Sequence, residues 1–319
     1  MIVKDNITKR ILFDPLINDV NELYICTAYA TPTMLSWYIK NIYQKTICPI
    51  KISLIIGMVP IYGISQNAHE NFLNILNDKR PQEIEKLECS YICDGPAVHS
   101  NIYIWAKNEN PKFAFTGSAS FVQNSFVGLH RQEFMVECDP IQTKNYYDSL
   151  VSRSIYINHS ELEENVKLYS INPFLNNKEV SVSELEKEGE YVTLSLLTNS
   201  GETGKRSGLN WGQRPHRNPN EAYIPLPSII AKSGFFPLEK KHFAAITDDR
   251  HQLILRIEQQ NNKAITTPAR NSDLGEYFRN RLGLANGDFI SRSDLDRYGR
   301  TDVKFIKFDE ETYYLDFSV

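Results

Sequence analysis

A nearly continuous apolar segment, Ile50 to Met58 (IKISLIIGM), limits the fold of this chain more than any other feature. A strand that is apolar on both faces must be covered on both, which is typical of parallel strands between layers of helices. The expected strands of this half are Glu22–Tyr29, Ile50–Met58, Leu87–Asp94, Val98–Ala106, Lys112–Thr116 and Gln132–Cys138, and the expected helices are Thr33–Tyr43, Gln66–Asn77 and Ile141–Arg153. This alternation predicts an α/β domain.

The second half has a different pattern, in which short strands are separated by turn residues. Its expected strands are Tyr191–Thr198, Phe243–Thr247, Gln252–Gln259, Val303–Phe308 and Thr312–Phe317, and its expected helices are Pro227–Ser233 and Ser272–Leu282, the latter with Arg279 and Arg281 in solvent. Polar and charged residues dominate between the two halves. The 319 residues therefore predict an α/β domain over 1–160, a connection over 161–189 and a mainly β domain over 190–319.

Composition narrows the class of protein. Hydrophobic residues make up 41% and charged residues 23%, as in ordinary globular proteins. No apolar run approaches the roughly 20 residues that span a bilayer, and the N-terminus lacks the pattern of a secretory signal, so we expect a cytoplasmic location. Among the five cysteines only Cys89 and Cys93 lie close together, which favours free thiols over a zinc site. With a net charge of −4, any contact with nucleic acid depends on local charge.

Residues suited to phosphate chemistry occur at three places in the first half. The segment from Val98 to Trp105 alternates strictly, so His99 and Asn101 fall on one face of the expected strand, opposite to Ile102 and Ile104. A small-residue turn, Gly117-Ser118-Ala119-Ser120, follows the next strand, and Glu133 opens the strand after that. An imidazole can act as a nucleophile whose tautomer a carboxylate fixes. Taken alone, however, a histidine on such a strand is more often a packed or surface residue.

Two polar segments stand out in the second half: a first arm, Thr203–Arg217 (TGKRSGLNWGQRPHR), and a second arm, Gln259–Asn271, neither with an acidic residue. Arginine, amide and hydroxyl side chains read base edges, and lysines hold phosphates. The candidate DNA contacts are Lys205, Arg206, Ser207, Asn210, Trp211, Gln213, Arg214, Arg217, Asn262, Lys263, Thr266, Arg270 and Asn271. The alternatives are that the arms are simply solvated and that Trp211 anchors the first arm.

The order of His99, the Gly-Ser-x-Ser turn and Glu133 resembles the phospholipase D superfamily, in its restriction-endonuclease branch (the BfiI and NgoFVII group). The second half, through SGLNWGQR, NSDLGEYFRNRLGL and YGRTDV, resembles the B3-like DNA-recognition domains of those enzymes. The resemblance implies a phospholipase D-like α/β nuclease domain followed by a mainly β pseudobarrel. It also implies His99 as nucleophile, Glu133 as its orienting carboxylate and the positions of Asn101 and Ser120 for phosphate contact, with no metal and no cofactor.

Two residues depart from that family's pattern. Asn101 stands where a lysine is expected, and Ser120 stands where an asparagine is expected. A serine hydroxyl still donates a hydrogen bond, but the loss of a cation beside a phosphoryl transition state predicts impaired catalysis. None of the six other histidines has a lysine two residues on that could mark a second copy of the motif, so one motif copy per chain implies a homodimer that shares one active site.

We therefore expect a subunit of a sequence-specific restriction endonuclease that hydrolyses DNA phosphodiesters without a metal. Its expected partners are double-stranded DNA, a second copy of the chain and, as for some relatives, a separate ATPase or translocase subunit and a cognate methyltransferase. The alternative is a non-catalytic DNA-binding protein with a nuclease-like dimerisation domain, which Asn101 favours. The third hypothesis is a lipid- or nucleotide-processing hydrolase of the same superfamily, which would not need the polar arms.

Overall fold

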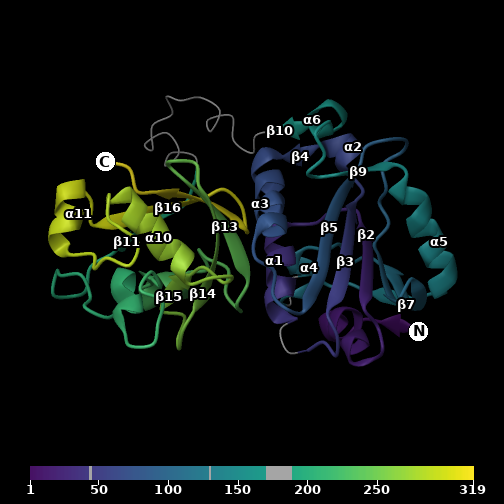
Figure 1. Cartoon of the computed structure of the whole chain (residues 1–319), viewed down its shortest axis with the longest axis horizontal. Helices are drawn as coiled ribbons and strands as arrows, with labels where there is room; N and C mark the ends of the chain where they lie inside the picture. Colours follow the sequence, from purple (N-terminus) through teal and green to yellow (C-terminus); the bar gives the residue numbers. More distant parts are fainter. Residues whose placement is uncertain (43–44, 129–130, 170–188) are drawn as a thin grey trace. The chain divides into compact units, whose positions relative to one another are not determined.

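The computed structural model describes residues 1–42, 45–128, 131–169 and 189–319 (Figure 1). The chain divides into two compact units, residues 1–176 and 177–319. Most of the predicted connection, residues 170–188, lies outside the described residues; α6 (Leu162–Asn165) and β10 (Leu168–Tyr169) come just before it. No helix in the described ranges has the length and apolar character that crossing a membrane requires.

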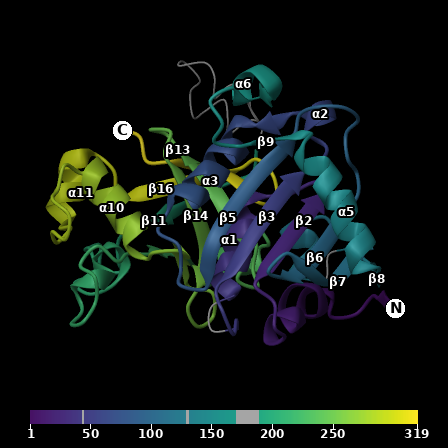
Figure 2. The same ribbon diagram turned by 45° about the vertical axis from the view of Figure 1, so that its right-hand side comes forward.

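Within its described residues, the first unit contains an eight-stranded sheet of order β1-β8-β7-β6-β2-β3-β5-β9, whose strands from β5 to β8 lie side by side in Figure 2. The strands are β1 (Ile2–Val3), β2 (Glu22–Thr27), β3 (Ile50–Ile56), β5 (Ile84–Ile92), β6 (Ile102–Lys107), β7 (Asn110–Gly117), β8 (Met135–Glu137) and β9 (Ser154–Tyr156). Strands β2, β3 and β5 are parallel to one another. The pairs β2/β6, β6/β7 and β7/β8 are antiparallel. A separate parallel pair joins β4 (Ile64–Ser65) to β10.

Helices cover both faces of this sheet: α1 (Pro32–Asn41) and α3 (Gln66–Asn77) lie on one side and α5 (Pro140–Val151) on the other (Figure 1). The short helices are a π-helix (Thr8–Phe13), a 3-10 turn (Asp14–Ile17), α2 (Val59–Tyr62) and α4 (Gln123–Phe126). Tyr103 and Trp105 pack into the core under α1, whereas Ile104 packs with Tyr147 of α5. These two layers of helices explain why most residues of β3 are buried, and they confirm the predicted α/β fold.

One predicted strand is wrong at its start. The expected strand from Val98 begins only at Ile102 in the structure. The Val98 amide instead donates to the carbonyl of Gly57 at 2.9 Å, outside the β6 ladder. The segment that carries His99 is therefore a connection leading into β6 and not part of the sheet.

The described residues of the second unit form a seven-stranded sheet of order β11-β16-β17-β13-β14-β15-β12. Its two edge strands lie against each other, so the sheet is nearly closed and barrel-like. The strands are β11 (Tyr191–Ser195), β12 (Ile224–Pro225), β13 (His242–Thr247), β14 (Gln252–Glu258), β15 (Ala264–Thr266), β16 (Asp302–Lys307) and β17 (Thr312–Asp316), and the helices are a 3-10 helix (Gly208–Gln213), α9 (Ser228–Lys232), α10 (Ser272–Arg281) and α11 (Arg292–Tyr298). Phe236, Phe243 and Tyr313 pack in its core. The predicted mainly β pseudobarrel is confirmed, although α11, β12 and β15 were not predicted.

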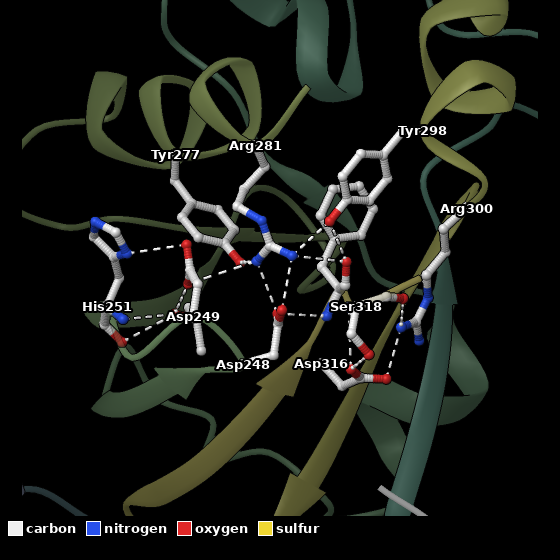
Figure 3. Close-up of polar contacts among 11 residues, drawn as sticks. Asp248, Asp249, His251, Tyr277, Arg281, Tyr298, Arg300, Asp316 and Ser318 are labelled. Carbon is white, nitrogen blue, oxygen red and sulfur yellow. Dashed lines mark hydrogen bonds and ion pairs between the residues drawn. The ribbon is translucent and has the colours of Figure 1, made fainter. Parts of the chain in front are cut away.

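A polar cluster joins the C-terminal elements of this unit, and Figure 3 shows Arg281 at its centre. Arg281, on α10, pairs through both terminal nitrogens with Asp248, at 2.8 and 2.7 Å, and donates to the Tyr298 hydroxyl and the Phe317 carbonyl. Arg279 is fully buried and donates to backbone carbonyls. The prediction that Arg279 and Arg281 are solvated is therefore wrong: both hold α10 against its neighbours.

Candidate active site and DNA interface

Asn101 is the acceptor at the centre of a buried hydrogen-bond cluster where β2 and β7 end. Its Oδ1 accepts from the Thr27 hydroxyl at 2.8 Å, the Ala28 amide at 3.1 Å and the Ser120 hydroxyl at 3.1 Å. Only 4% of Asn101 is exposed. The Thr27 hydroxyl in turn accepts from the Phe121 amide at 3.0 Å. Asn101 thus ties the end of β2 to the turn that carries Ser120.

The amide nitrogen of Asn101 is engaged as well. Its Nδ2 donates to the carbonyls of Gly117 and Ser118, each at 3.2 Å. An amide nitrogen has two donors, so both hydrogens already have protein acceptors. Since a buried side chain with all its partners made has no donor left for a phosphate oxygen, the arrangement gives Asn101 a structural role.

The carboxylate of Glu133 is held by two serine hydroxyls. Ser125 donates to Oε1 at 2.7 Å, and Ser118 makes a short hydrogen bond to Oε2. The sequence predicted Glu133 within a strand over Gln132–Cys138, but β8 begins only at Met135, so Glu133 lies just before it. Over the described ranges, no hydrogen bond joins Glu133 to His99. Ser118 belongs to the predicted turn, whereas no pattern in the sequence marks Ser125.

The side chain of His99 is exposed. Its ring lies edge-on to the ring of Tyr29, with centroids 6.1 Å apart and planes at 88°. The structure thus connects Asn101, Ser120 and Glu133 through one cluster. His99, two residues before Asn101 in the chain, is exposed and contacts Tyr29. Thr27 and Tyr29 are further residues of this region that the sequence did not single out.

In the second unit, the first arm is held from inside by two side chains predicted to contact DNA. Asn210 is fully buried; its Nδ2 donates to the Ile290 carbonyl at 2.8 Å and its Oδ1 accepts from the Ile290 amide at 2.9 Å. Gln213 donates to the Gly287 carbonyl at 2.9 Å. The prediction that Asn210 reads a base is corrected here, because its amide is used to fold the arm.

Trp211 anchors the middle of the first arm. Its ring lies edge-on to Tyr223, with centroids 5.7 Å apart, and the Arg217 guanidinium lies 4.0 Å from the Trp211 centroid. Arg217 also pairs with Glu221 at 2.5 Å. These contacts match the alternative in which Trp211 holds the arm, and they leave the charge of Arg217 partly neutralised.

The second arm contains the strand β15, which pairs with both β14 and β12. Thr266, on β15, is 1% exposed and its hydroxyl donates to Glu258 at 3.0 Å, so the prediction that Thr266 contacts DNA is corrected. Asn271 precedes the first residue of α10 without a side-chain capping hydrogen bond, and its carbonyl accepts from the Ala222 amide at 3.1 Å. Arg270 is exposed and pairs with Asp273 at 3.0 Å.

Four exposed cations of the arms form no ion pair within the parts of the chain that the structure describes. They are Lys205, Arg206, Arg214 and Lys263. Ser207 and Asn262 are half-buried. Both arms bond to the residues that flank β12: the Tyr223 amide donates to the Gly208 carbonyl at 3.1 Å, and the Leu226 amide donates to the Lys263 carbonyl at 2.8 Å. The basic side chains therefore project from a backbone framework that β12 fixes.

An α/β unit in which a Gly-Ser turn is bonded to Asn101 and Glu133, followed by a nearly closed β unit with basic arms, is the arrangement expected of a DNA-targeting nuclease. Family models match both parts: residues 5–164 match the NgoFVII restriction endonuclease N-terminal PLD domain, and residues 184–309 match the NgoFVII C-terminal B3-like DNA-binding domain. The chain belongs to the NgoFVII restriction endonuclease family, a family of sequence-specific nucleases, and its partner is DNA.

Other comparisons give weaker likenesses. No curated protein matches this chain. NucT from Helicobacter pylori is 17% identical, covers 49% of this chain and 97% of its own, and has a TM-score of 0.32. A polyphosphate kinase from Porphyromonas gingivalis is 15% identical, covers 52% of this chain and 26% of its own, and also has a TM-score of 0.32.

Proposed function

We propose that this chain is the DNA-recognising and DNA-cleaving subunit of a restriction endonuclease, in which His99 attacks a phosphodiester without a metal ion and Asn101 leaves the reaction slow. The observation that carries the proposal is that candidate site residues far apart in the sequence meet in the folded chain. Asn101, Ser120 and Glu133 come from separate segments and form one hydrogen-bonded cluster, and the exposed His99 lies two residues before Asn101 in the chain. A separate ATPase or translocase and a cognate methyltransferase stay proposed partners of the whole system.

In the proposed reaction, a nitrogen of the His99 imidazole bonds to phosphorus, and the bond from phosphorus to one deoxyribose oxygen breaks. The leaving oxygen takes a proton, for which the partner subunit's His99 is the proposed donor in a homodimer with one shared site. Water then attacks phosphorus and gives a proton back to the partner subunit's His99, while the phosphorus–nitrogen bond breaks and regenerates the imidazole. Ser120, whose hydroxyl lies at the edge of the cluster, is the proposed phosphate contact.

The low rate follows from the Asn101 contacts. Loss of a single preorganised donor to a developing oxyanion typically costs about 10² to 10³ in rate. Asn101 brings no charge to the site, and its two donors are already bound to the Gly117 and Ser118 carbonyls. No other group of the chain is proposed to replace the missing lysine.

The test uses the full chain on a mixed-sequence plasmid in excess EDTA, with and without a candidate ATPase subunit. Slow nicking by the wild type and none by His99→Ala is the expected result. His159→Ala is the matched control, since His159 is also an exposed histidine of the first unit. Equal nicking by the wild type and His99→Ala would exclude His99 as the nucleophile.

A second function, a non-catalytic sequence-specific DNA-binding protein, is favoured by the fully occupied amide of Asn101. It predicts tight binding of one DNA sequence with no nicking by either the wild type or Asn101→Lys. The two proteins are to be compared at a temperature where both are folded. Discrete fragments from either protein would rule this second function out.

A further inference from the structure

The backbone on both sides of His99 is fixed by contacts to three different elements. Before it, the Val98 amide donates to the carbonyl of Gly57. A Cβ at Gly57 would lie 2.0 Å from the Val98 carbonyl oxygen, so this approach requires glycine. After it, the Ser100 hydroxyl lies 3.1 Å from the hydroxyl of Tyr146 on α5, and Asn101 is buried in its cluster. The position of the His99 Cα is therefore set.

The orientation of the His99 ring is not set by these contacts. Rotation of an imidazole about χ2 is broad and roughly two-fold, and the two ring nitrogens differ in their protonation. Glu133, which the family resemblance expects to orient the histidine, has its oxygens bonded to Ser118 and Ser125. In the part of the chain that the structure describes, His99 makes no hydrogen bond, and a ring contact with Tyr29 is available to orient it.

Tyr29 makes the ring contact with His99. It follows the end of β2, and its backbone is held on the C-terminal side by the bridge between Ala30 and Phe121. The Tyr62 ring, from α2, lies on Tyr29 with centroids 6.1 Å apart and planes at 36°. Desolvation and the neighbouring Tyr62 raise the pKa of Tyr29 above its ordinary value, which agrees with the closeness of the two rings. Edge-to-face ring pairs of this kind prefer defined orientations.

We propose that Tyr29, braced by Tyr62, is a positioning residue that sets the orientation of the His99 ring. The inference rests on the proposed function, in which His99 is the nucleophile. Tyr29 touches no reacting atom in this scheme; it acts by limiting the angles at which the imidazole meets the phosphate. Misplacement of a nucleophile by even about 1 Å is enough to slow a reaction strongly.

The direct test is the nuclear magnetic resonance signal of the His99 ring in histidine-labelled full-length protein, assigned by its loss in His99→Gln. Tyr29→Ala should move this signal toward the position of a free histidine, because the ring current of the neighbour is lost. Tyr29→Phe should keep it in place, and Tyr62→Ala should move it part of the way. Tyr156→Ala, at another exposed tyrosine of the same unit, is the control. An unchanged signal in Tyr29→Ala would overturn the inference.

Plasmid nicking supplies the second readout. Tyr29→Ala should lower the nicking rate about tenfold with unchanged DNA affinity, and Tyr29→Phe should match the wild type. If His99→Ala nicks as fast as the wild type, the proposed function fails, and the resonance of His99 alone decides whether Tyr29 orients the ring. If His99→Ala is inactive while Tyr29→Ala nicks at the wild-type rate, the positioning role is disproved.

Discussion

The side chain of Asn101 makes five hydrogen bonds. It accepts three, from Thr27, Ala28 and Ser120, and donates two, to the carbonyls of Gly117 and Ser118. A lysine at this position carries only donors, so the groups that now give hydrogen bonds to Oδ1 would lose that acceptor. The surroundings of the site are therefore matched to an amide. At the scale of the residue, the departure from the family pattern is part of the fold.

We predict that Asn101→Lys lowers the free energy of unfolding of the first unit by about 3 kcal/mol, since buried polar groups lose their acceptor and an ammonium enters a buried site. Urea unfolding followed by circular dichroism measures it. The matched control is Asn77→Lys, at an exposed position of α3, where we expect a change within about 0.5 kcal/mol. A loss no larger than that of the control would show that the amide contacts contribute little.

His69, on α3, is the residue from which we expect a pH effect. It is 8% exposed and its Nδ1 lies 3.2 Å from the Tyr91 hydroxyl; burial lowers its pKa, against the smaller opposite effect of Glu70 and Glu163. The unfolded chain therefore binds the His69 proton more readily than the folded chain. The contribution of His69 to the free energy of unfolding is therefore present at a pH above the ordinary histidine pKa of about 6.5, and it is lost as the pH falls below that value.

The measurement for His69 is the free energy of unfolding of the wild type and His69→Gln at pH 7.5 and at a pH below the ordinary value. The wild type should lose more stability on acidification than the variant. The same loss in both proteins would mean that His69 does not titrate differently on folding.

At the scale of the element, α10 packs against the end of the loop that follows the first arm. A Cβ at Gly275 would lie 1.8 Å from the carbonyl oxygen of Asn220. The Asn220 Oδ1 also accepts from the Gly287 amide at 2.7 Å, so this loop cannot move away freely. Helix propensity and packing therefore act in opposite directions at Gly275.

We predict that Gly275→Ala destabilises the second unit by about 1–3 kcal/mol, although alanine in a helix interior is favoured over glycine by about 1 kcal/mol. Asn280→Ala, at an exposed position of the same helix, should leave stability unchanged or raise it. Chemical denaturation of both variants gives the comparison. A gain in stability for Gly275→Ala would show that the close approach to Asn220 is not required.

At the scale of the whole molecule, binding of DNA by a chain of net charge −4 depends on where its free cations lie. Each phosphate contact that a cation makes changes the slope of log K against log salt by about 0.9 for duplex DNA. The unpaired cations of the arms are the groups that should contribute to this slope.

We predict that Lys205→Ala, Arg206→Ala and Arg214→Ala each weaken binding of duplex DNA and reduce its salt slope by about 1. Fluorescence anisotropy of the full chain at several salt concentrations measures both quantities. Arg297→Ala, at an exposed arginine of α11 that pairs with Asp294 at 3.2 Å, is the control. A slope that stays at the wild-type value in all the arm variants would place the DNA contacts elsewhere.

The sequence by itself determined the layers and most elements of this protein. Helix α3 spans the predicted Gln66–Asn77, and β3 starts at the predicted Ile50, because periodicity and apolar runs depend on near neighbours in the chain. The order of the His99, Ser120 and Glu133 segments was also readable, and with the second half it led to the family that both family models match.

Only the tertiary structure decided which polar side chains face inward. Asn101, Asn210 and Thr266 have the same chemistry as residues that contact phosphates and bases, yet each is buried and bonded within the fold. Asn210 meets Ile290, which lies 80 residues later, and no local pattern marks that meeting. The same holds for Thr27 and Ser125 at the candidate active site. The physical reason is that a hydrogen bond depends on the positions of both partners, and only folding brings a partner from a distant part of the sequence into place.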